Sequence, residues 1–228
     1  MAFNLQNFKT RTLTAIFFAA IMLAGIFMNV YAFMALFTII AVGCMMEFAK
    51  IIKQIDYDKR FTFLPFVFIY ILIPIFMMVS LGVKKENDSV HLDSLFPCAI
   101  LFSIWINDTM AYLIGSVIGK TPFSKISPKK TWEGTIGGAI LCIIIITLLF
   151  HATSLFPNEL SILNWVVIAS LCALFGTVGD LFESKLKRMA GIKDSGNIMP
   201  GHGGFLDRFD SLLFATPAVW IYVKYFIA

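Results

Sequence analysis

The sequence has little charge, and long parts of it have none. Only 14% of its 228 residues are Asp, Glu, Lys or Arg, against about 25% in an ordinary soluble domain. Four stretches contain no such residue: 12–46, 61–83, 134–158 and 160–179. A helix needs roughly 20 apolar residues to cross a bilayer core, so each stretch can span it and the first can hold two short helices. Four such stretches exclude a soluble protein with one buried helix.

Motifs that would explain a soluble nucleotide- or metal-binding domain are missing as well. The sequence has no glycine-rich P-loop and no Cys-x-x-Cys pair, and its four cysteines all lie within apolar runs. A zinc site is therefore not expected, and we interpret the cysteines as small packing residues. The first apolar stretch is longer than the roughly 7–15 residues of a cleaved signal peptide, which predicts an uncleaved anchor.

The apolar stretches predict an all-α integral membrane protein, a single helical domain over residues 1–228 with about seven transmembrane helices and no soluble domain. The expected spans are residues 12–29, 31–48, 62–82, 94–118, 134–154, 162–180 and 209–227, with a turn near Asn29. Most lysines and arginines then fall on one side, and basic loops face the cytoplasm. We expect the N-terminus inside, the C-terminus outside, and polar loops 119–133 and 181–208 in the cytoplasm. A compact chain without organelle-targeting features favours a bacterial inner membrane.

The second loop belongs to a polar segment, residues 180–210, that contrasts with the apolar runs around it. Its candidate functional side chains are Asp180, Ser184, Lys187, Arg188, Lys193, Asp194, His202, Asp207, Arg208 and Asp210, and Lys193-Asp194-Ser195-Gly196 is a turn-like sequence. If the preceding helix continues, the first four share one helix face. The glycines of PGHGG, residues 200–204, allow a ligand to approach the backbone closely, and N–H groups in such a turn can form an anion-binding nest.

These residue types suit the chemistry of phosphate groups. Lysine and arginine neutralise the charge of reacting phosphoryl groups, and Mg²⁺ is usually held by one or two carboxylates together with the substrate's phosphates. The alternative is a solvated cytoplasmic loop with ordinary helix caps. We favour the phosphate site, because an ordinary loop has little use for PGHGG followed closely by DRFD.

Two further features are candidates for the same site. Lys129 and Lys130 follow a Ser-Pro turn in the first loop; alone they indicate a positive-inside loop, but facing the same side as residues 180–210 they become a second phosphate clamp. Asp108 lies inside a predicted span, where a carboxylate is costly and usually functional. A polar packing contact and a substrate or metal role both stay open for Asp108. The Ala-x-x-x-Gly-x-x-x-Gly stripe that follows, residues 111–119, is interpreted as helix packing.

The polar segment resembles the signature of the phosphatidate cytidylyltransferases, also called CDP-diglyceride synthases, which reads SxxKR, then KD, a glycine-containing turn and PxHGGxxDRxD. The sequence matches it at Ser184, Lys187, Arg188, Lys193, Asp194, Gly196, Pro200, His202, Gly203, Gly204, Asp207, Arg208 and Asp210. Met199 stands where the family usually has Leu, Ile or Phe. The stretch DTMAYLIGSVIGKTPFSKISPKKTWEG is similar to a second family region, so the resemblance covers about residues 105–215.

The resemblance implies transfer of a cytidylyl group from CTP to phosphatidic acid, with release of pyrophosphate, in phospholipid biosynthesis. It implies Mg²⁺ as cofactor, with a second, monovalent cation as an additional candidate, and Asp180, Asp207 and Asp210 as metal ligands. The catalytic candidates are Ser184, Lys187, Arg188, Lys193, Asp194, His202 and Arg208. The substrate-binding candidates are Asp108, Lys129, Lys130, Gly201, Gly203 and Gly204. We expect CTP, phosphatidic acid and membrane lipids as partners, no nucleic acid, and an arrangement compatible with a homodimer.

Other functions stay open at this point. A CTP-dependent kinase of a polyprenol or similar lipid alcohol would release CDP instead of pyrophosphate, and the same transfer onto an archaeal ether lipid is also compatible. A secondary transporter often has repeated halves and a polar site near the bilayer midplane. Here no repeat is visible and most charge lies at one membrane face, so Asp108 is the one feature that suits a transporter.

Overall fold

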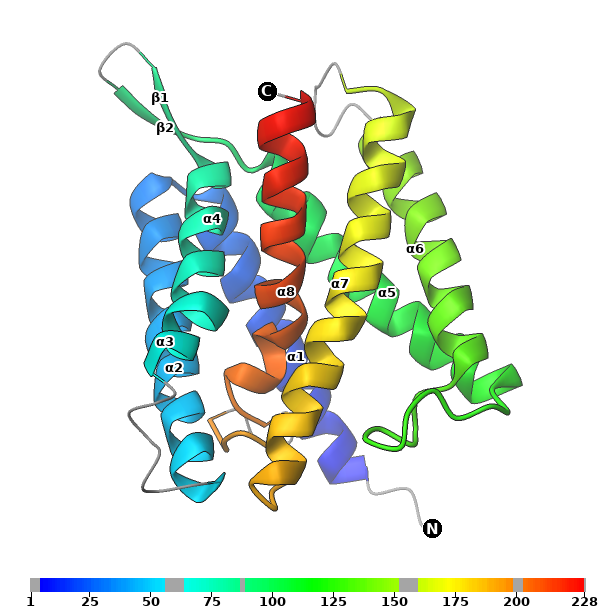
Figure 1. Ribbon diagram of the computed structural model, residues 1–228. Helices are drawn as coiled ribbons and strands as arrows, with labels where there is room; N and C mark the ends of the chain where they lie inside the picture. Colours follow the sequence, from blue (N-terminus) through cyan, green and yellow to red (C-terminus); the bar gives the residue numbers. More distant parts are fainter. Residues whose placement is uncertain (1–4, 56–63, 87–88, 152–159, 199–202, 228) are drawn as a thin grey trace. The chain divides into compact units, whose positions relative to one another are not determined.

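The computed structural model describes residues 5–55, 64–86, 89–151, 160–198 and 203–227, and most of them are helical (Figure 1). Within the described residues, five helices are long and apolar enough to cross a membrane: Val30–Ile55, Pro65–Gly82, Leu95–Ile118, Trp132–His151 and Ile162–Met189. The first predicted span is helical with a shorter apolar part, Thr12–Phe27. The last is α8, Leu206–Tyr222, followed by the π-helical turn η3, Val223–Ile227. The predicted all-α integral membrane fold is confirmed.

The chain divides into two compact units. The first unit comprises residues 1–94 and 186–209, and the second comprises 95–185 and 210–228. Two helices, α7 (Ile162–Met189) and α8, contribute residues to both units. The polar segment 180–210 is therefore shared: its middle belongs to the first unit, and its two ends belong to the second.

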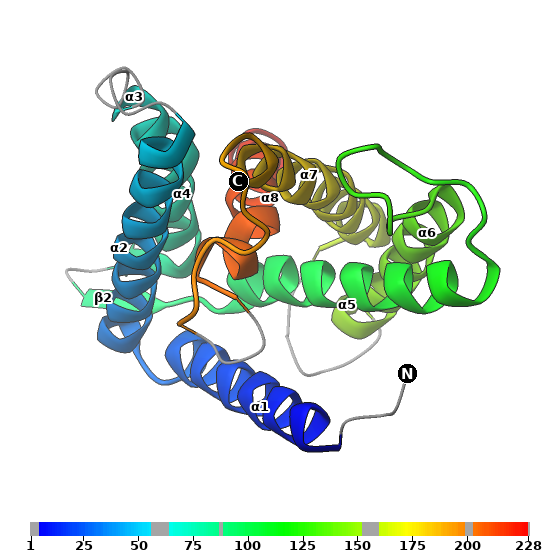
Figure 2. The same ribbon diagram turned by 90° about the horizontal axis from the view of Figure 1, so that it is seen from below.

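The first unit is built on a helical hairpin. Helix α1, Leu5–Phe27, and helix α2, Val30–Ile55, are separated at Asn29, whose side-chain oxygen accepts the Ala32 N–H at 2.9 Å and so caps α2. This confirms the predicted turn. The helical segment α3, η2 and α4 (Leu64–Val67, Phe68–Leu72 and Ile73–Gly82) runs beside α2 (Figures 1 and 2).

A short β-hairpin follows α4 and was not predicted from the sequence. Strands β1, Val83–Glu86, and β2, Ser89–Leu92, pair antiparallel, with Lys84 opposite His91. The hairpin extends beyond the end of α4 (Figure 1). It is a small addition to the helical fold and lies outside the resemblance described above.

The second unit is held together by close approaches at glycines. Helices α5, Leu95–Ile118, and α6, Trp132–His151, meet where Gly134 and Gly138 face Ala111. A Cβ atom at Gly134 would lie 2.7 Å from the Ala111 carbonyl oxygen, and one at Gly138 would lie 2.6 Å from the Ala111 nitrogen. The small-residue stripe is thus used for helix packing, as predicted.

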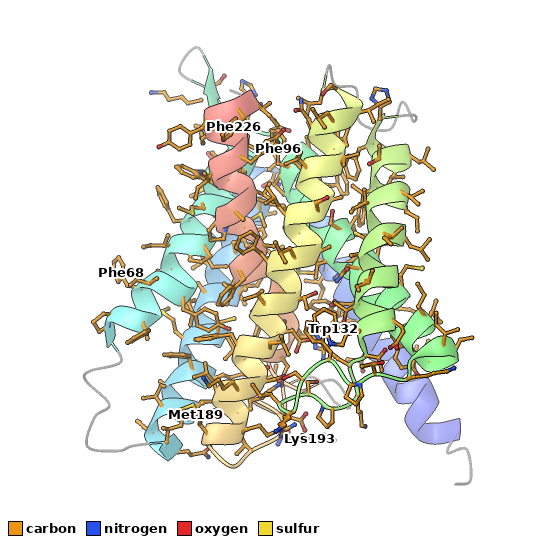
Figure 3. All side chains as sticks on the ribbon, turned by 45° about the vertical axis from the view of Figure 1, so that its right-hand side comes forward. Phe68, Phe96, Trp132, Met189, Lys193 and Phe226 are labelled. Atoms are coloured by element: carbon orange, nitrogen blue, oxygen red, sulfur yellow. The ribbon has the colours of Figure 1, made fainter. Side chains whose placement is uncertain are left out.

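The outward faces of the helices carry large apolar side chains, as lipid-facing helices do. Phe68 on η2 is 61% exposed and projects away from the helices around it (Figure 3). The four cysteines are instead free thiols buried among the helices. Their predicted role as packing residues is confirmed, and Cys142 also donates a hydrogen bond to the Ser103 carbonyl of α5 at 3.2 Å.

Candidate active site

The first polar loop, residues 119–131 of the second unit, is folded back onto the start of α6. The Glu133 carboxylate accepts hydrogen bonds from the Lys120 and Thr121 N–H groups at 3.2 Å and from the Thr121 hydroxyl at 2.8 Å. The loop's two ends are joined by the Phe123 N–H, which donates to the Lys130 carbonyl at 2.7 Å. Glu133 was not among the residues predicted from the sequence, yet its carboxylate fixes the loop that carries Lys129 and Lys130.

The start of α6 is also capped and packed. Thr131 Oγ1 accepts the Gly134 N–H at 3.1 Å, which satisfies one of the free donors of the first helical turn. The Trp132 ring meets Phe123 edge-on, with 4.5 Å between ring centroids. Figure 3 shows Trp132 at this end of α6, where the loop joins the helix. The loop is therefore an ordered structure with defined lysine positions.

Lys130 brings this loop to α7, where its ammonium forms an ion pair with Asp180. The other Asp180 oxygen accepts the Ser184 hydroxyl at 3.2 Å, one helical turn further on. The helix continues past residue 180, the predicted end of the span, because α7 extends to Met189, so the condition stated above for a shared helix face is met. Two of the sequence candidates from separate segments, Lys130 and Asp180, are thus in direct contact.

Asp210 belongs to the same cluster of charges. It is only 8% exposed and accepts the Ser211 N–H at 2.6 Å. Asp180, Asp108 and Lys130 all lie close enough to interact electrostatically with it. Gly179 of α7 makes this approach possible, since a Cβ there would lie 2.5 Å from the Asp210 carbonyl oxygen.

This cluster, Asp108, Lys130, Asp180 and Asp210, joins three carboxylates and one ammonium in the second unit. Across residues 5–55, 64–86, 89–151, 160–198 and 203–227, no three or more His, Cys, Asp or Glu side chains are placed to hold a metal ion by themselves. Asp108 is exposed and takes a weak 3.5 Å hydrogen bond from the Asn107 amide. Any cation at the cluster would need ligands from elsewhere.

The remaining candidates lie in the first unit, where α7 ends. The helix closes with Gly191 in the left-handed conformation, φ +69°, and the Ile192 N–H returns to the Lys187 carbonyl at 2.9 Å, the hydrogen bond of a Schellman cap. Arg188 donates to the Ile192 carbonyl at 3.0 Å. Lys193 follows, exposed at this end of α7 (Figure 3).

Asp207, in the first turn of α8, organises the loop between the two helices. Its Oδ1 accepts Lys187 Nζ at 2.6 Å, and its Oδ2 accepts the N–H groups of Ser195 at 2.8 Å and Gly204 at 2.9 Å. Burial raises the pKa of this carboxyl. The hydrogen bond from Gly204 and the hydrogen bond and charge of Lys187 outweigh burial, so the pKa lies below its ordinary value. Oδ1 keeps a second lone pair, with which it can bind a ligand.

Glycine is required beside Asp207. Gly203 has φ +83°, which strains any residue with a side chain, and a Cβ atom there would overlap Asp207 Oδ2. Gly204 is buried and donates to the same oxygen. The glycines of the motif therefore serve the internal structure of the loop, in addition to any ligand contact.

A carboxylate that was not predicted from the sequence reaches this loop from the N-terminal part of the chain. Glu47 of α2 is 2% exposed, and its Oε2 accepts the Ser195 hydroxyl at 2.6 Å and the Leu206 N–H at 2.9 Å. A signal was present, because Glu47 is the sole acidic residue among the first 55 and lies within an apolar helix.

The structure brings together only some of the predicted residues. Lys129, Asp194 and Arg208 are exposed. Gly201 and His202 lie outside the described residues. The catalytic, substrate-binding and metal roles of the individual residues stay predictions.

Comparison with the sequences of known proteins identifies relatives of this chain. A model of the cytidylyltransferase family matches residues 90–226. Phosphatidate cytidylyltransferase of Aquifex aeolicus is 42% identical over 149 residues, which are 65% of this chain and 52% of the relative. The enzyme of the same name from Thermotoga maritima is 43% identical over 129 residues, 55% of this chain and 47% of the relative.

A plant relative shows the same local similarity. The chloroplastic phosphatidate cytidylyltransferase 4 of Arabidopsis thaliana is 49% identical over 118 residues, 51% of this chain and 29% of the relative. The chain thus spans about half the length of the bacterial relatives and less than a third of the plant one. The matched family region contains both polar loops, α7 and α8.

Proposed function

The chain belongs to the cytidylyltransferase family, and we propose that it transfers the cytidylyl group of CTP to phosphatidic acid. In this reaction an oxygen of the lipid phosphate attacks the α-phosphorus of CTP. The bond from that phosphorus to the bridging oxygen of the β-phosphate breaks, and pyrophosphate leaves with the electron pair. The products are CDP-diacylglycerol and pyrophosphate.

The observation that carries the proposal is the contact between Lys130 and Asp180 beside Asp210. It joins a cation and carboxylates from three segments, the combination that a nucleotide triphosphate with its counter-ion requires. Positioning and charge neutralisation supply most of the catalysis in such transfers, since the protein forms no covalent bond to the substrate.

Each candidate side chain has a role in this scheme. Cations on both loops bind the phosphates of CTP and the lipid; they are Lys129, Lys130, Lys187, Arg188 and Arg208. The nucleotide and its pyrophosphate are seated by Ser184, Lys193, Asp194, His202 and the glycines 201, 203 and 204. Asp108 adds negative charge to the carboxylate cluster.

Mg²⁺ is the proposed cofactor, and the residues fit it. Asp180 and Asp210 supply hard oxygen ligands whose mutual repulsion a divalent cation would relieve. Mg²⁺ commonly takes only one or two carboxylates and completes its shell with phosphate oxygens and water. Bound Mg²⁺ would neutralise charge on the phosphates. Asp207 is proposed as a metal ligand as well, through its Oδ1, and a second, monovalent cation is an additional candidate.

The same contacts support a proposed arrangement in the membrane. Lys130 meets α7 at Asp180, in the half of that helix that leads into the second polar loop, and we infer that the two loops leave the membrane on one side. Because both loops are basic, we place this side in the cytoplasm of a bacterial cell, with the N-terminus inside. Anionic lipids attracted to it would include the substrate. A homodimer is part of the proposal, but the small-residue stripe of α5 does not support it, because that stripe packs against α6 of the same chain.

Purified protein in detergent–lipid micelles with Mg²⁺, CTP and phosphatidic acid tests the function. Release of pyrophosphate and formation of a CTP-derived lipid are measured together. Both should occur, and D180N should lower both by at least about 10²-fold, the scale for removing a transition-state charge contact. The control is S170A, since that hydroxyl donates to the Val166 carbonyl within its own helix.

Other outcomes assign other functions. CDP with a phosphorylated lipid alcohol would show the kinase. Solute flux in sealed vesicles without pyrophosphate would show a transporter. Either result would overturn the proposed transfer.

A further inference from the structure

Glu47 holds the loop between α7 and α8 at two points. Its acceptor Oε2 binds Ser195 and Leu206, which bracket the glycine-rich stretch of the loop. One buried carboxylate thereby fixes both ends of the twelve-residue segment 195–206, which contains Gly203 and Gly204. A hydrogen bond to a charged group contributes about twice as much as one between neutral groups, so two at one oxygen make a firm anchor.

The backbone of the loop is shaped to admit this carboxylate. Gly196 and Gly204 both face it, and a Cβ atom at either position would overlap a Glu47 oxygen. Neither glycine has a positive φ that would explain its identity. The approach of Glu47 gives a steric reason for glycine at these two positions of the motif.

Helix α2 provides a matching surface one turn away. Gly43 precedes Glu47 by four residues and so lies on the same helix face. A Cβ atom at Gly43 would overlap the Phe205 ring, which is the neighbour of Gly204 and Leu206. On this face of α2, Gly43 thus gives the Phe205 ring room to pack, and the Glu47 carboxylate accepts hydrogen bonds from the loop.

Ser195 links Glu47 to Asp207. Its hydroxyl lies 2.6 Å from Glu47 Oε2 and 3.0 Å from Asp207 Oδ2, and it accepts the Asp207 N–H at 3.3 Å. A hydroxyl has one proton to donate. Glu47 makes the shorter contact and accepts this hydrogen bond. The hydroxyl is thereby oriented so that the Ser195 oxygen faces the Asp207 backbone N–H.

We propose that Glu47 is a positioning residue for the nucleotide transfer, acting through Ser195 and Leu206 on Asp207 and Arg208. This inference rests on the proposed function and extends it to a helix outside the family-matched region. Removing the carboxylate leaves the buried Leu206 N–H without its acceptor and leaves Asp207 Oδ2, 3.0 Å away, as the remaining acceptor of the Ser195 hydroxyl, so the loop loses its hydrogen bonds to α2. A misplacement of about 1 Å at a reacting group lowers a rate by about 10²-fold.

The first test compares E47A, E47Q and the control K50A, an exposed side chain on the same helix. E47A should lower kcat by about 10²-fold with little change in KM for the lipid, as expected when transition-state alignment is lost. E47Q keeps one acceptor oxygen and should recover part of that loss, while K50A should match the wild type. Unchanged kcat in E47A, or a loss seen only in KM, would overturn the proposal.

A second test does not depend on any activity. Hydrogen exchange followed by mass spectrometry should show faster exchange over residues 195–206 in E47A, with residues 40–44 still protected. Unchanged exchange in the loop would contradict the anchoring role. If the wild type makes no CDP-lipid, the proposed function fails, yet this experiment still decides whether Glu47 holds the loop. Should E47A not fold, E47D, which keeps the charge but shortens the reach, replaces it.

A double-mutant cycle separates positioning from ligand contact. G204A should lower kcat in the wild-type background, because the new methyl group overlaps Glu47. In E47A that overlap is gone, so G204A should add little further loss. Multiplicative losses would instead mean that Gly204 contacts the substrate independently of Glu47, which would refute the steric argument.

Discussion

Replacing Gly138 by alanine should separate α5 from α6, the pair of helices that carries the first polar loop. The added methyl group would lie 2.6 Å from the Ala111 nitrogen and 2.7 Å from its Cα and Cβ. Backbone atoms cannot rotate away as a flexible side chain can. Overpacking of this kind costs about 1–3 kcal/mol, which lowers the folding equilibrium by about 5- to 150-fold at about 1.4 kcal/mol for each tenfold change.

The adjacent glycine provides a matched control. A Cβ atom at Gly137 would lie 2.7 Å from Ile114 Cδ1, the end of a flexible side chain. G137A should therefore destabilise the protein less than G138A. The additional change A111G should recover only part of the G138A loss, since it removes the overlap with Cβ and leaves the overlaps with the nitrogen and Cα.

Thiol labelling of Cys142 measures the separation directly. This buried cysteine of α6 donates to the Ser103 carbonyl of α5, so it becomes reactive when the helices part. Labelling under increasing denaturant, located by mass spectrometry, should begin earlier in G138A than in G137A or the wild type. Equal labelling of all three, or earlier labelling in G137A, would refute the packing argument.

Three further predictions concern the polar loops. K130A and D180A should each reduce the rate of pyrophosphate release. The double variant should release pyrophosphate no more slowly than the less active single variant, because the effects of residues that act as a unit are not additive. Multiplicative losses of rate would contradict a shared role. T131A should lower the unfolding free energy by about 1 kcal/mol through loss of the α6 cap, and T131S should restore it in a denaturant titration. Proteolysis at acid pH tests Asp207, whose lowered pKa stabilises the fold above the ordinary value of 3.8. Protection of its loop should hold above that value and decline as pH falls through the lower folded-state pKa, whereas D207N should show no such decline.

The sequence predicts the helices better than their ends. Charge-free runs reveal membrane helices because lipid excludes charge, and the turn at Asn29 was placed correctly. Helix α2 continues to Ile55, past the predicted end at residue 48, and α7 continues to Met189, past residue 180. The hydropathy pattern indicates where the lipid-facing part of a helix ends. The helix itself can continue into water when its caps and packing allow. The hairpin of β1 and β2 was missed because each strand is only four residues long and three of the four residues of β1 are charged.

The candidate site, too, could be predicted only in part from the sequence. Motif spacing singled out Asp180 and Lys130, which meet in the structure. Glu133 and Glu47 were missed because their partners lie outside any local motif: Glu133 contacts residues 12 and 13 positions before it, and Glu47 and Ser195 are 148 residues apart. No local pattern encodes which backbone a buried carboxylate will contact. The one signal in the sequence was an isolated acidic residue in an apolar helix. Such a residue is expected to have a role, but the sequence does not show which residues it contacts.

The distance between Glu47 and Ser195 also has a consequence for biogenesis. At about 5–20 residues per second of synthesis, the 148 residues that separate them take about 7–30 s to make. During that interval α2 enters the membrane with a carboxylate whose partners do not yet exist. The insertion machinery must accept that acid unpaired, and the loop can reach its final form only after most of the chain has left the ribosome.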